Sequence, residues 1–333
     1  MTMIRRPRTH ILLIDGTFSQ LTAGRETNIG LIYRLLEEVG QTATQTVTYH
    51  PGVQGRGFRK WWHAALGIGL NDAIAEGYAS IASRYRAGDR LVLLGYSRGA
   101  YAVRSLAGWI GRVGLLRARH ATHRRVLRSF RYYEARSTSK AAEAFREKFC
   151  HDEVPIEMIG VFDTVKALGL PYPVLSRFAP MATDFHDHSL TPCIRHAFQV
   201  LAADETRLSY EPVYWRPDQH WPGALEQVWF PGGHADVGGQ VWRQPEARAL
   251  SNIPLAWMLD RLETCGVTLP LGLRDRIACD PAAPRLNPYT GWGKWFLFRG
   301  PRNIPPELNS SAHSSVSARE ELIPGYVPSF TRS

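Results

Sequence analysis

Long apolar stretches are missing from this chain of 333 residues. The first apolar run, Ile11–Ile14, is interrupted by Asp15 and is too short for the core of a secretory signal peptide. No later stretch approaches the roughly 20 consecutive apolar residues that a membrane-spanning helix requires. We therefore expect a protein that is cytoplasmic as synthesised, without a signal peptide or transmembrane segment, so that any secretion would follow a signal-peptide-independent route.

Cysteine is also scarce. The four cysteines lie far apart and form no CxxC pair: Cys150, Cys193, Cys265 and Cys279. This spacing argues against a zinc site and a thioredoxin-like motif and favours reduced, structural thiols. The only cluster of metal-binding residue types that we single out lies in a proline-bounded segment without a recognised ligand spacing, and it comprises Asp184, His186, Asp187 and His188. We expect no metal and no other cofactor.

Acidic residues are outnumbered by basic ones. The 30 Asp and Glu residues face 40 Lys and Arg residues, which gives a formal net charge of +10 and favours approach to anionic surfaces such as membranes or nucleic acid. Residues Arg117–Lys140 are strongly basic and include Phe130, Tyr132 and Tyr133. No nucleic-acid-binding motif accompanies them, so we expect a solvated basic helix and no nucleic-acid partner. The alternative function is a basic membrane- or nucleic-acid-interacting protein with weak or no catalysis.

Short apolar runs alternate with segments of helical periodicity. The runs typical of strands are His10–Ile14, Thr44–Tyr49, Asp89–Leu94, Glu157–Phe162 and Leu225–Phe230. The helical segments are Thr27–Gly40, Asn71–Tyr85 and Tyr101–Ile110. This alternation predicts a mostly parallel sheet flanked by helices. We expect a single domain, 1–333, in which 115–152 and 240–294 are helical and loop insertions that form a cap above the sheet.

The candidate catalytic residues follow the predicted strands. Asp15, Ser97, Asp163, His234 and Asp236 all stand just past a strand end. Because such sheets bind ligands beyond the carboxyl ends of their strands, we expect one shared active site there.

Ser97 is the predicted nucleophile. It lies in Gly95-Tyr96-Ser97-Arg98-Gly99, between a six-residue strand and an apolar helix, which is the context that the GxSxG motif of α/β-hydrolases requires. A serine on this sharp turn projects its oxygen into the site, and the backbone N–H of Arg98 faces a developing oxyanion. The turn after the first strand, near Thr17, is the best candidate for the second oxyanion donor.

Two Ser-acid-His triads fit the chain order of this fold. One pairs Asp163 with His234, and the other pairs Asp236 with His313. If Trp295–Arg299 is the last strand, His313 lies on the loop beyond it, where the histidine is expected. The strand count therefore favours Ser97, Asp236 and His313, with Asp163, His234 and Asp15 as supporting or alternative residues.

A series of motifs spans nearly the whole chain. They are DGTF after the first strand, TNIG at Thr27–Gly30, GVQGRG at Gly52–Gly57, the block around GYSRG, GVFDTVKALG at Gly160–Gly169, HAFQVLAADETR at His196–Arg207, VWFPGGHADVGG at Val228–Gly239 and HSSV at His313–Val316. The chain resembles the α/β-hydrolase family of formerly unknown function that includes phospholipase effectors of the bacterial type VI secretion system. The resemblance implies a lipase-like fold and a triad of Ser97, Asp236 and His313. Phe162 and Ser314 stand where the family often has Trp and Pro.

The expected function is hydrolysis of a carboxylic ester, a lipid or phospholipid acyl ester, through an acyl-enzyme on Ser97, so that the chain is a serine esterase or lipase of phospholipase A type. The expected partners are the lipid or ester substrate, a membrane surface, and a secretion-system or immunity protein. The segment Phe58–Trp62 combines cations with aromatic rings, which suits a lipid interface. Packing of Trp61 and Trp62 in the core is the favoured alternative.

Overall fold

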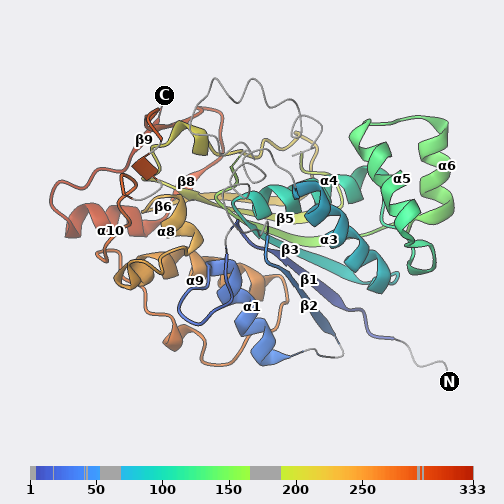
Figure 1. Cartoon of the computed structure of the whole chain (residues 1–333), viewed down its shortest axis with the longest axis horizontal. Coiled ribbons are helices and arrows are strands. Elements are labelled where there is room, and N and C mark those ends of the chain that lie inside the picture. The colour runs from blue at the N-terminus through green and yellow to red at the C-terminus, as the bar shows by residue number, and fades with distance from the viewer. Residues whose placement is uncertain are drawn as a thin grey trace.

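Seven parallel strands form the main sheet of this computed structural model, which describes residues 5–332 except 18, 41, 43, 53–68, 166–188, 291–292 and 295. In spatial order the strands are β2 (Gln45–His50), β1 (Thr9–Ile14), β3 (Arg90–Tyr96), β4 (Ile156–Phe162), β5 (Ile194–Ala202), β6 (Ala224–Phe230) and β8 (Ser311–Ala312). Every neighbouring pair is parallel. The carboxyl ends of all these strands therefore lie along one edge of the sheet (Figure 1).

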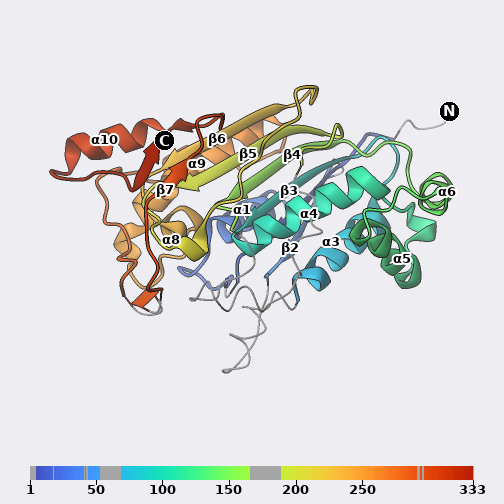
Figure 2. The same cartoon turned by 90° about the horizontal axis from the view of Figure 1, so that it is seen from above.

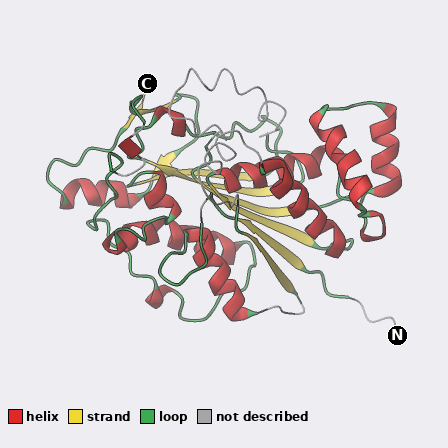
Figure 3. Ribbon diagram, in the orientation of Figure 1, coloured by secondary structure: helices red, strands yellow, loops and turns green. Residues whose placement is uncertain are grey.

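Helices cover both faces of the sheet (Figures 2 and 3). Helices α3 (Leu70–Arg84) and α4 (Arg98–Val113) cover one face, and α1 (Asn28–Val39) and α9 (Arg248–Thr264) cover the other. Strand β1 contributes to both layers, because Leu12 and Ile14 pack with the first pair of helices, whereas Ile11 and Leu13 pack with the second. This alternation is the period of two of a strand that is buried on both sides. The predicted α/β class is confirmed.

Two strand assignments differ from the sequence-based expectation. Strand β5 was not expected, because Arg195 and His196 interrupt the apolar run at its start, and yet it pairs between β4 and β6. The predicted last strand, Trp295–Arg299, is wrong in the part that the structure describes: Trp295 lies outside it, and Arg299 makes only an isolated bridge with Arg207. The last strand of the sheet is β8.

The basic stretch forms a helical pair at the end of the sheet that is remote from Ser97. The pair consists of α5 (His123–Glu134) and α6 (Lys140–Phe149), and the short 3-10 helix η1 (Ala118–His120) precedes it. The pair leaves the main fold at the end of α4 and returns at the amino end of β4, where Leu116 bridges to Cys150. It packs beside α3 and α4 (Figure 1), so that it does not cap the carboxyl ends of the strands.

The second expected insertion, 240–294, is largely part of the core. Its helix α9 supplies buried side chains such as Leu255, Met258 and Leu262 to the sheet-covering layer. The remaining elements are short: α8 (His234–Gly238), α10 (Ser314–Leu322), β7 (Arg302–Ile304) paired with β9 (Phe330–Arg332), and the 3-10 helices η2 (Leu208–Tyr210), η3 (Pro245–Ala247) and η4 (Arg274–Arg276). Among the described helices, none has an apolar stretch long enough to cross a membrane.

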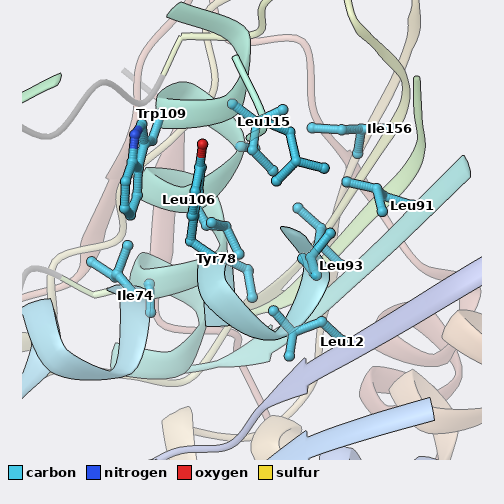
Figure 4. Packing of buried hydrophobic residues seen from close by; sticks show 14 of the residues in the cluster. Leu12, Ile74, Tyr78, Leu91, Leu93, Leu106, Trp109, Leu115 and Ile156 are labelled. Atoms are coloured by element: carbon cyan, nitrogen blue, oxygen red, sulfur yellow. The ribbon is translucent and has the colours of Figure 1, made fainter. Parts of the chain in front are cut away.

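A buried tyrosine ties α3 to the end of α4. The ring of Tyr78 stacks on Trp109 with 3.8 Å between the ring centroids, within the cluster shown in Figure 4. Its hydroxyl donates to the carbonyl of Gly114 at 2.7 Å and accepts the N–H of Leu116 at 2.9 Å. One hydroxyl thus satisfies two buried backbone groups where the chain leaves α4.

Replacing this hydroxyl tests the tie without removing the ring. We expect Tyr78→Phe to lower the free energy of unfolding by about 1–3 kcal/mol, because two buried backbone groups lose their partner. Denaturant unfolding followed by circular dichroism measures the change. Tyr132→Phe is the matched control, since the Tyr132 ring packs on Phe145 and its hydroxyl makes no hydrogen bond with the residues that the structure describes. Equal stability of both variants would contradict this role of Tyr78.

Candidate active site

Ser97 occupies a backbone turn that only its glycine neighbours permit. It connects β3 to α4 with φ 57° and ψ −118°, and its N–H donates to the carbonyl of Phe162 at 3.0 Å. A Cβ on Gly95 would lie 2.5 Å from the carbonyl oxygen of Gly99, and one on Gly99 would lie 2.0 Å from that of Ile14. Both glycines of the GxSxG pattern are therefore required by close backbone contacts, and the strained serine is the expected feature of this motif.

The structure brings Ser97 together with His234 and Asp163. The Oγ of Ser97 lies 2.9 Å from Nε2 of His234, and Nδ1 of the same ring lies 2.7 Å from Oδ2 of Asp163. The three residues follow three different strands of the sheet, β3, β4 and β6, and His234 is the first residue of α8. This is a continuous hydrogen-bonded chain from a hydroxyl through an imidazole to a carboxylate, the arrangement that activates a serine.

Asp163 is buried and fully engaged. Its Oδ1 accepts the backbone N–H of Ala202 at 3.1 Å, and Arg302 donates to both of its oxygens, at 2.6 Å and 2.8 Å. Burial alone would raise the pKa of the Asp163 carboxyl, but the charge and hydrogen bonds of Arg302, together with His234, hold that pKa well below its ordinary value. Asp163 is therefore ionised whenever the protein is folded at ordinary pH.

Aromatic rings and a second ion pair surround His234. Its ring lies 5.0 Å from that of Tyr96 and meets that of Tyr210 edge-on at 4.8 Å, measured between centroids. Its backbone N–H donates to Glu205, which also pairs with Arg207 at 2.6 Å. Burial lowers the pKa of His234 below its ordinary value, although Asp163 acts in the opposite direction. The imidazole is thus neutral near pH 7 and able to accept a proton.

Asp236 and His313, the favoured pair from the strand count, do not meet at Ser97. Asp236 accepts the N–H groups of Gly233 at 2.8 Å and Leu286 at 2.9 Å, and burial raises its pKa to about 6. The Nδ1 of His313 accepts the N–H of Ser315 at 3.1 Å and so caps α10. The imidazole also stacks on Phe230. Both side chains have structural roles among the described residues, and neither hydrogen-bonds to Ser97, Asp163 or His234.

The unexpected strand β5 explains this difference. The sequence-based strand count did not include β5. It therefore placed the acid at the end of β6 and the histidine beyond the last strand of the sheet. With β5 in place, the acid follows β4, the strand next to the nucleophile strand, and the histidine follows β6. The geometry brings together the alternative pair, Asp163 and His234.

The turn after β1, which contacts the start of α4 at Gly99, is held by the side chain of Asp15. Asp15 is buried, and its carboxylate accepts hydrogen bonds from the N–H of Gly16 and from the hydroxyls of Ser19, Thr27 and Tyr49. It therefore fixes the turn and does not touch the imidazole. Burial raises its pKa above the ordinary value, against the effect of these hydrogen bonds.

The two expected oxyanion donors, Arg98 and Thr17, belong to the start of α4 and to the turn after β1. Arg98 is the first residue of α4, where backbone N–H groups point out of the helix end. The carbonyl of Thr17 accepts the side-chain amide of Gln240 at 3.1 Å. The Oγ1 of Thr17 is buried and has no hydrogen-bond partner in the part of the chain that the structure describes.

Three residues of the site were missed by the sequence analysis. Glu205 and Tyr210 follow β5, and the HAFQVLAADETR block was a signal for the first of them, although it gave no role. Arg302 had no signal, because an isolated arginine in a loop-like segment is ordinarily solvated.

Two sequence-based candidates lie outside the described residues. They are the cluster Asp184, His186, Asp187 and His188 and the aromatic segment Phe58–Trp62. Within the described ranges, no three His, Cys, Asp or Glu side chains are placed so that they could hold a metal ion. All four cysteines are free.

Comparisons with known proteins give relatives over part of their lengths. An uncharacterized protein of Saccharomyces cerevisiae is 28% identical over 238 residues, 64% of this chain and 33% of its own length. An uncharacterized protein from Pseudomonas aeruginosa has a solved structure with a TM-score of 0.45 and 15% identity, over 82% of this chain and 49% of that one. The structure of the Tle1 effector bound to the VgrG spike from the type 6 secretion system has a TM-score of 0.39 and 18% identity, over 71% and 52%. The chain spans about a third of the yeast relative and about half of each of these two structures.

A family match covers most of the chain. Residues 8–261 match the family described as "T6SS, Phospholipase effector Tle1-like, catalytic domain", and this range includes Ser97, Asp163 and His234. The chain therefore belongs to the family of Tle1-like phospholipase effector catalytic domains of the type VI secretion system.

Proposed function

We propose that this chain is a serine hydrolase that cleaves a carboxylic ester of a lipid, with Ser97 as nucleophile, His234 as general base and acid, and Asp163 as the acid of the triad. The observation that carries the proposal is the hydrogen-bonded chain Ser97–His234–Asp163, with distances of 2.9 Å and 2.7 Å, on a turn whose strain is enforced by Gly95 and Gly99.

Acylation begins when Oγ of Ser97 attacks the ester carbonyl while Nε2 of His234 takes its proton. The imidazolium that forms is stabilised by the ionised Asp163. The negative charge on the carbonyl oxygen is met by the backbone N–H of Arg98 and by the turn at Thr17. As the tetrahedral intermediate collapses, the imidazolium gives its proton to the departing alcohol, and the acyl group remains on Ser97.

Deacylation repeats these steps with water. The neutral His234 takes a proton from the water, the hydroxide attacks the acyl-enzyme, and the proton returns to Ser97 as the carboxylic acid leaves. No group other than the side chains named above and the backbone donors is needed to balance the protons.

The substrate class that we propose is a phospholipid, with hydrolysis of a phospholipase A type. The description of the family supports this choice, as does the net charge of +10, which favours an anionic lipid surface. The same membership supports export as an effector and a partner in the secretion system.

Variants separate the two possible triads. We expect Ser97→Ala and His234→Ala to lower kcat for a short-chain ester by about 10⁴-fold or more, because each removes a group that acts as a unit with the others. His313→Asn should stay within about twofold of the native rate, because asparagine also caps a helix. Steady-state hydrolysis and fluorophosphonate labelling of Ser97 measure both effects.

Circular dichroism controls for folding of each variant. If labelling survives in His234→Ala and is lost in His313→Asn, then Asp236 and His313 form the working pair. Absence of labelling at Ser97 in the folded native protein would refute the serine mechanism itself.

The pH profile follows from the buried imidazole. The base works only when neutral, so activity is complete above the pKa of His234 and is lost as the pH falls through it. Since burial holds that pKa below its ordinary value of 6.5, we expect kcat/KM for an uncharged ester to fall only below about pH 6.5. An acidic limb centred above about pH 7 would contradict this environment for His234.

A substrate panel tests the lipid assignment. Native protein added to phospholipid vesicles should release fatty acid and lysophospholipid, detected by mass spectrometry, whereas Ser97→Ala should release neither. The identity of the lysophospholipid gives the position of the cleaved ester. Rapid hydrolysis of soluble esters with intact vesicles would leave the mechanism standing and overturn the substrate class.

A further inference from the structure

A buried arginine from the C-terminal part of the chain, Arg302, forms two hydrogen bonds with Asp163, the acid of the proposed triad. Arg302 is only 6% exposed, and its Nη1 and Nη2 donate to the two oxygens of Asp163 at 2.6 Å and 2.8 Å. The same two nitrogens donate to the carbonyls of Ala202 at 3.0 Å and Tyr210 at 2.7 Å. The four N–H groups at the end of the guanidinium are thus all engaged, two on the carboxylate and two on the backbone around it.

The backbone holds Arg302 in place independently of Asp163. It begins β7, its N–H donates to the carbonyl of Ser329 at 3.0 Å, and β7 pairs with β9 over three residues. Residue 302 lies outside the range 8–261 that matches the family. The contact therefore joins the matched catalytic region to a segment about 140 residues further along the chain than Asp163.

We propose that Arg302 is a positioning residue, which fixes the Asp163 carboxylate in the orientation that His234 needs and offsets its charge. The inference rests on the proposed function, because it concerns the same triad. A planar guanidinium with two parallel hydrogen bonds fixes the plane of a carboxylate as well as its position. Oδ1 is held by Arg302 and Ala202, and Oδ2 is shared by Nη2 of Arg302 and Nδ1 of His234.

The ion pair of Arg302 with Asp163 also affects the pKa of His234. Among the described residues, the groups that face the imidazole are the ion pair of Asp163 with Arg302, the ion pair of Glu205 with Arg207, the hydroxyl of Ser97, and the phenols of Tyr96 and Tyr210. Both carboxylates are offset by an arginine. A lone buried aspartate would favour the imidazolium, whereas a paired one favours it less. His234 therefore remains an available base at lower pH than a partner of an unpaired aspartate would.

Two substitutions separate position from charge. Arg302→Met removes both, so kcat should fall about 10- to 100-fold, the range known for loss of the hydrogen-bond partner that orients a metal-binding histidine, with little change in KM. The unopposed charge of Asp163 should also raise the pKa of His234 and move the acidic limb of kcat/KM to higher pH. Arg302→Lys keeps the charge without the two-point geometry, so kcat should fall while the acidic limb stays near its native position.

Arg104→Met is the matched control. Arg104 is also buried, donates to the backbone carbonyls of Val213 and Tyr214, and stacks on Trp215, but it has no contact with the triad among the described residues. Its loss should lower stability and leave the pH profile of kcat/KM unchanged. A limb that shifts equally in Arg104→Met and Arg302→Met would overturn the specific role of Arg302.

The outcomes distinguish failure of the proposed function from failure of the positioning role of Arg302. If native protein is not labelled by fluorophosphonate at Ser97, the proposed function fails. If the native protein is labelled and active, but Arg302→Lys keeps the native kcat, then the positioning role of Arg302 is overturned and the proposed function is unaffected. Should Arg302→Met not fold, Arg302→Lys decides, together with the downfield proton NMR signal of the hydrogen bond between His234 and Asp163. We expect that signal to move or broaden in Arg302→Lys, and an unchanged signal would count against the inference.

Discussion

The close contact between the start of α4 and the end of β1 determines where the nucleophile stands. Gly99 lies so near the carbonyls of Ile14 and Asp15 that no Cβ fits between them, and this contact holds Ser97 at its positive φ above the sheet. The carboxylate of Asp15 in turn fixes the turn that supplies one side of the contact. The strain at Ser97 is thus sustained by the packing of the start of α4 against the end of β1, and the histidine and the acid reach Ser97 from the same edge of the sheet.

The sequence predicts most of this arrangement. Periodicity located β1, α1, α3, β3, α4 and β4 to within a few residues, because their burial pattern is regular, and the GxSxG motif placed Ser97 on the correct turn. Periodicity failed at β5, where Arg195 is exposed and His196 half-buried at the start of the strand. A missed strand shifts every later assignment by one, and the strand-count argument for Asp236 and His313 followed from that shift. The family resemblance implied the same pair on separate grounds. In the HADVGG and HSSV motifs, Asp236 serves the start of α8 and His313 caps α10, whereas His234, the first residue of HADVGG, contacts Ser97.

Contacts between distant segments explain what sequence reasoning cannot reach. Asp163 could be identified as a strand-end acid, yet the reason that it stays ionised in a fully buried position is Arg302, which lies in a segment with neither strong periodicity nor a motif. A buried ion pair stabilises a fold only when its geometry and remaining hydrogen bonds compensate for desolvation. Here two backbone carbonyls and one backbone N–H bind the pair, but Nε of Arg302 is buried without a hydrogen-bond partner among the described residues, so the compensation is incomplete. The pair is well suited to fix a functional carboxylate and is weak grounds for assuming high stability.

The overall charge of the chain says little about the electrostatics of the site. Residues 117–148 contain ten of the 40 basic residues and three of the 30 acidic ones, and they form η1, α5 and most of α6 at the far end of α4. A helix of 16 residues separates this end from Ser97, which amounts to about 24 Å, well beyond the screening length of about 8 Å at physiological salt. The pKa of the imidazole is instead governed first by burial and then by two local pairs, Asp163 with Arg302 and Glu205 with Arg207, each with no net charge. The chemistry at Ser97 is therefore set by the burial of His234 and by which charges are paired around it, and the basic helices affect only what the protein approaches.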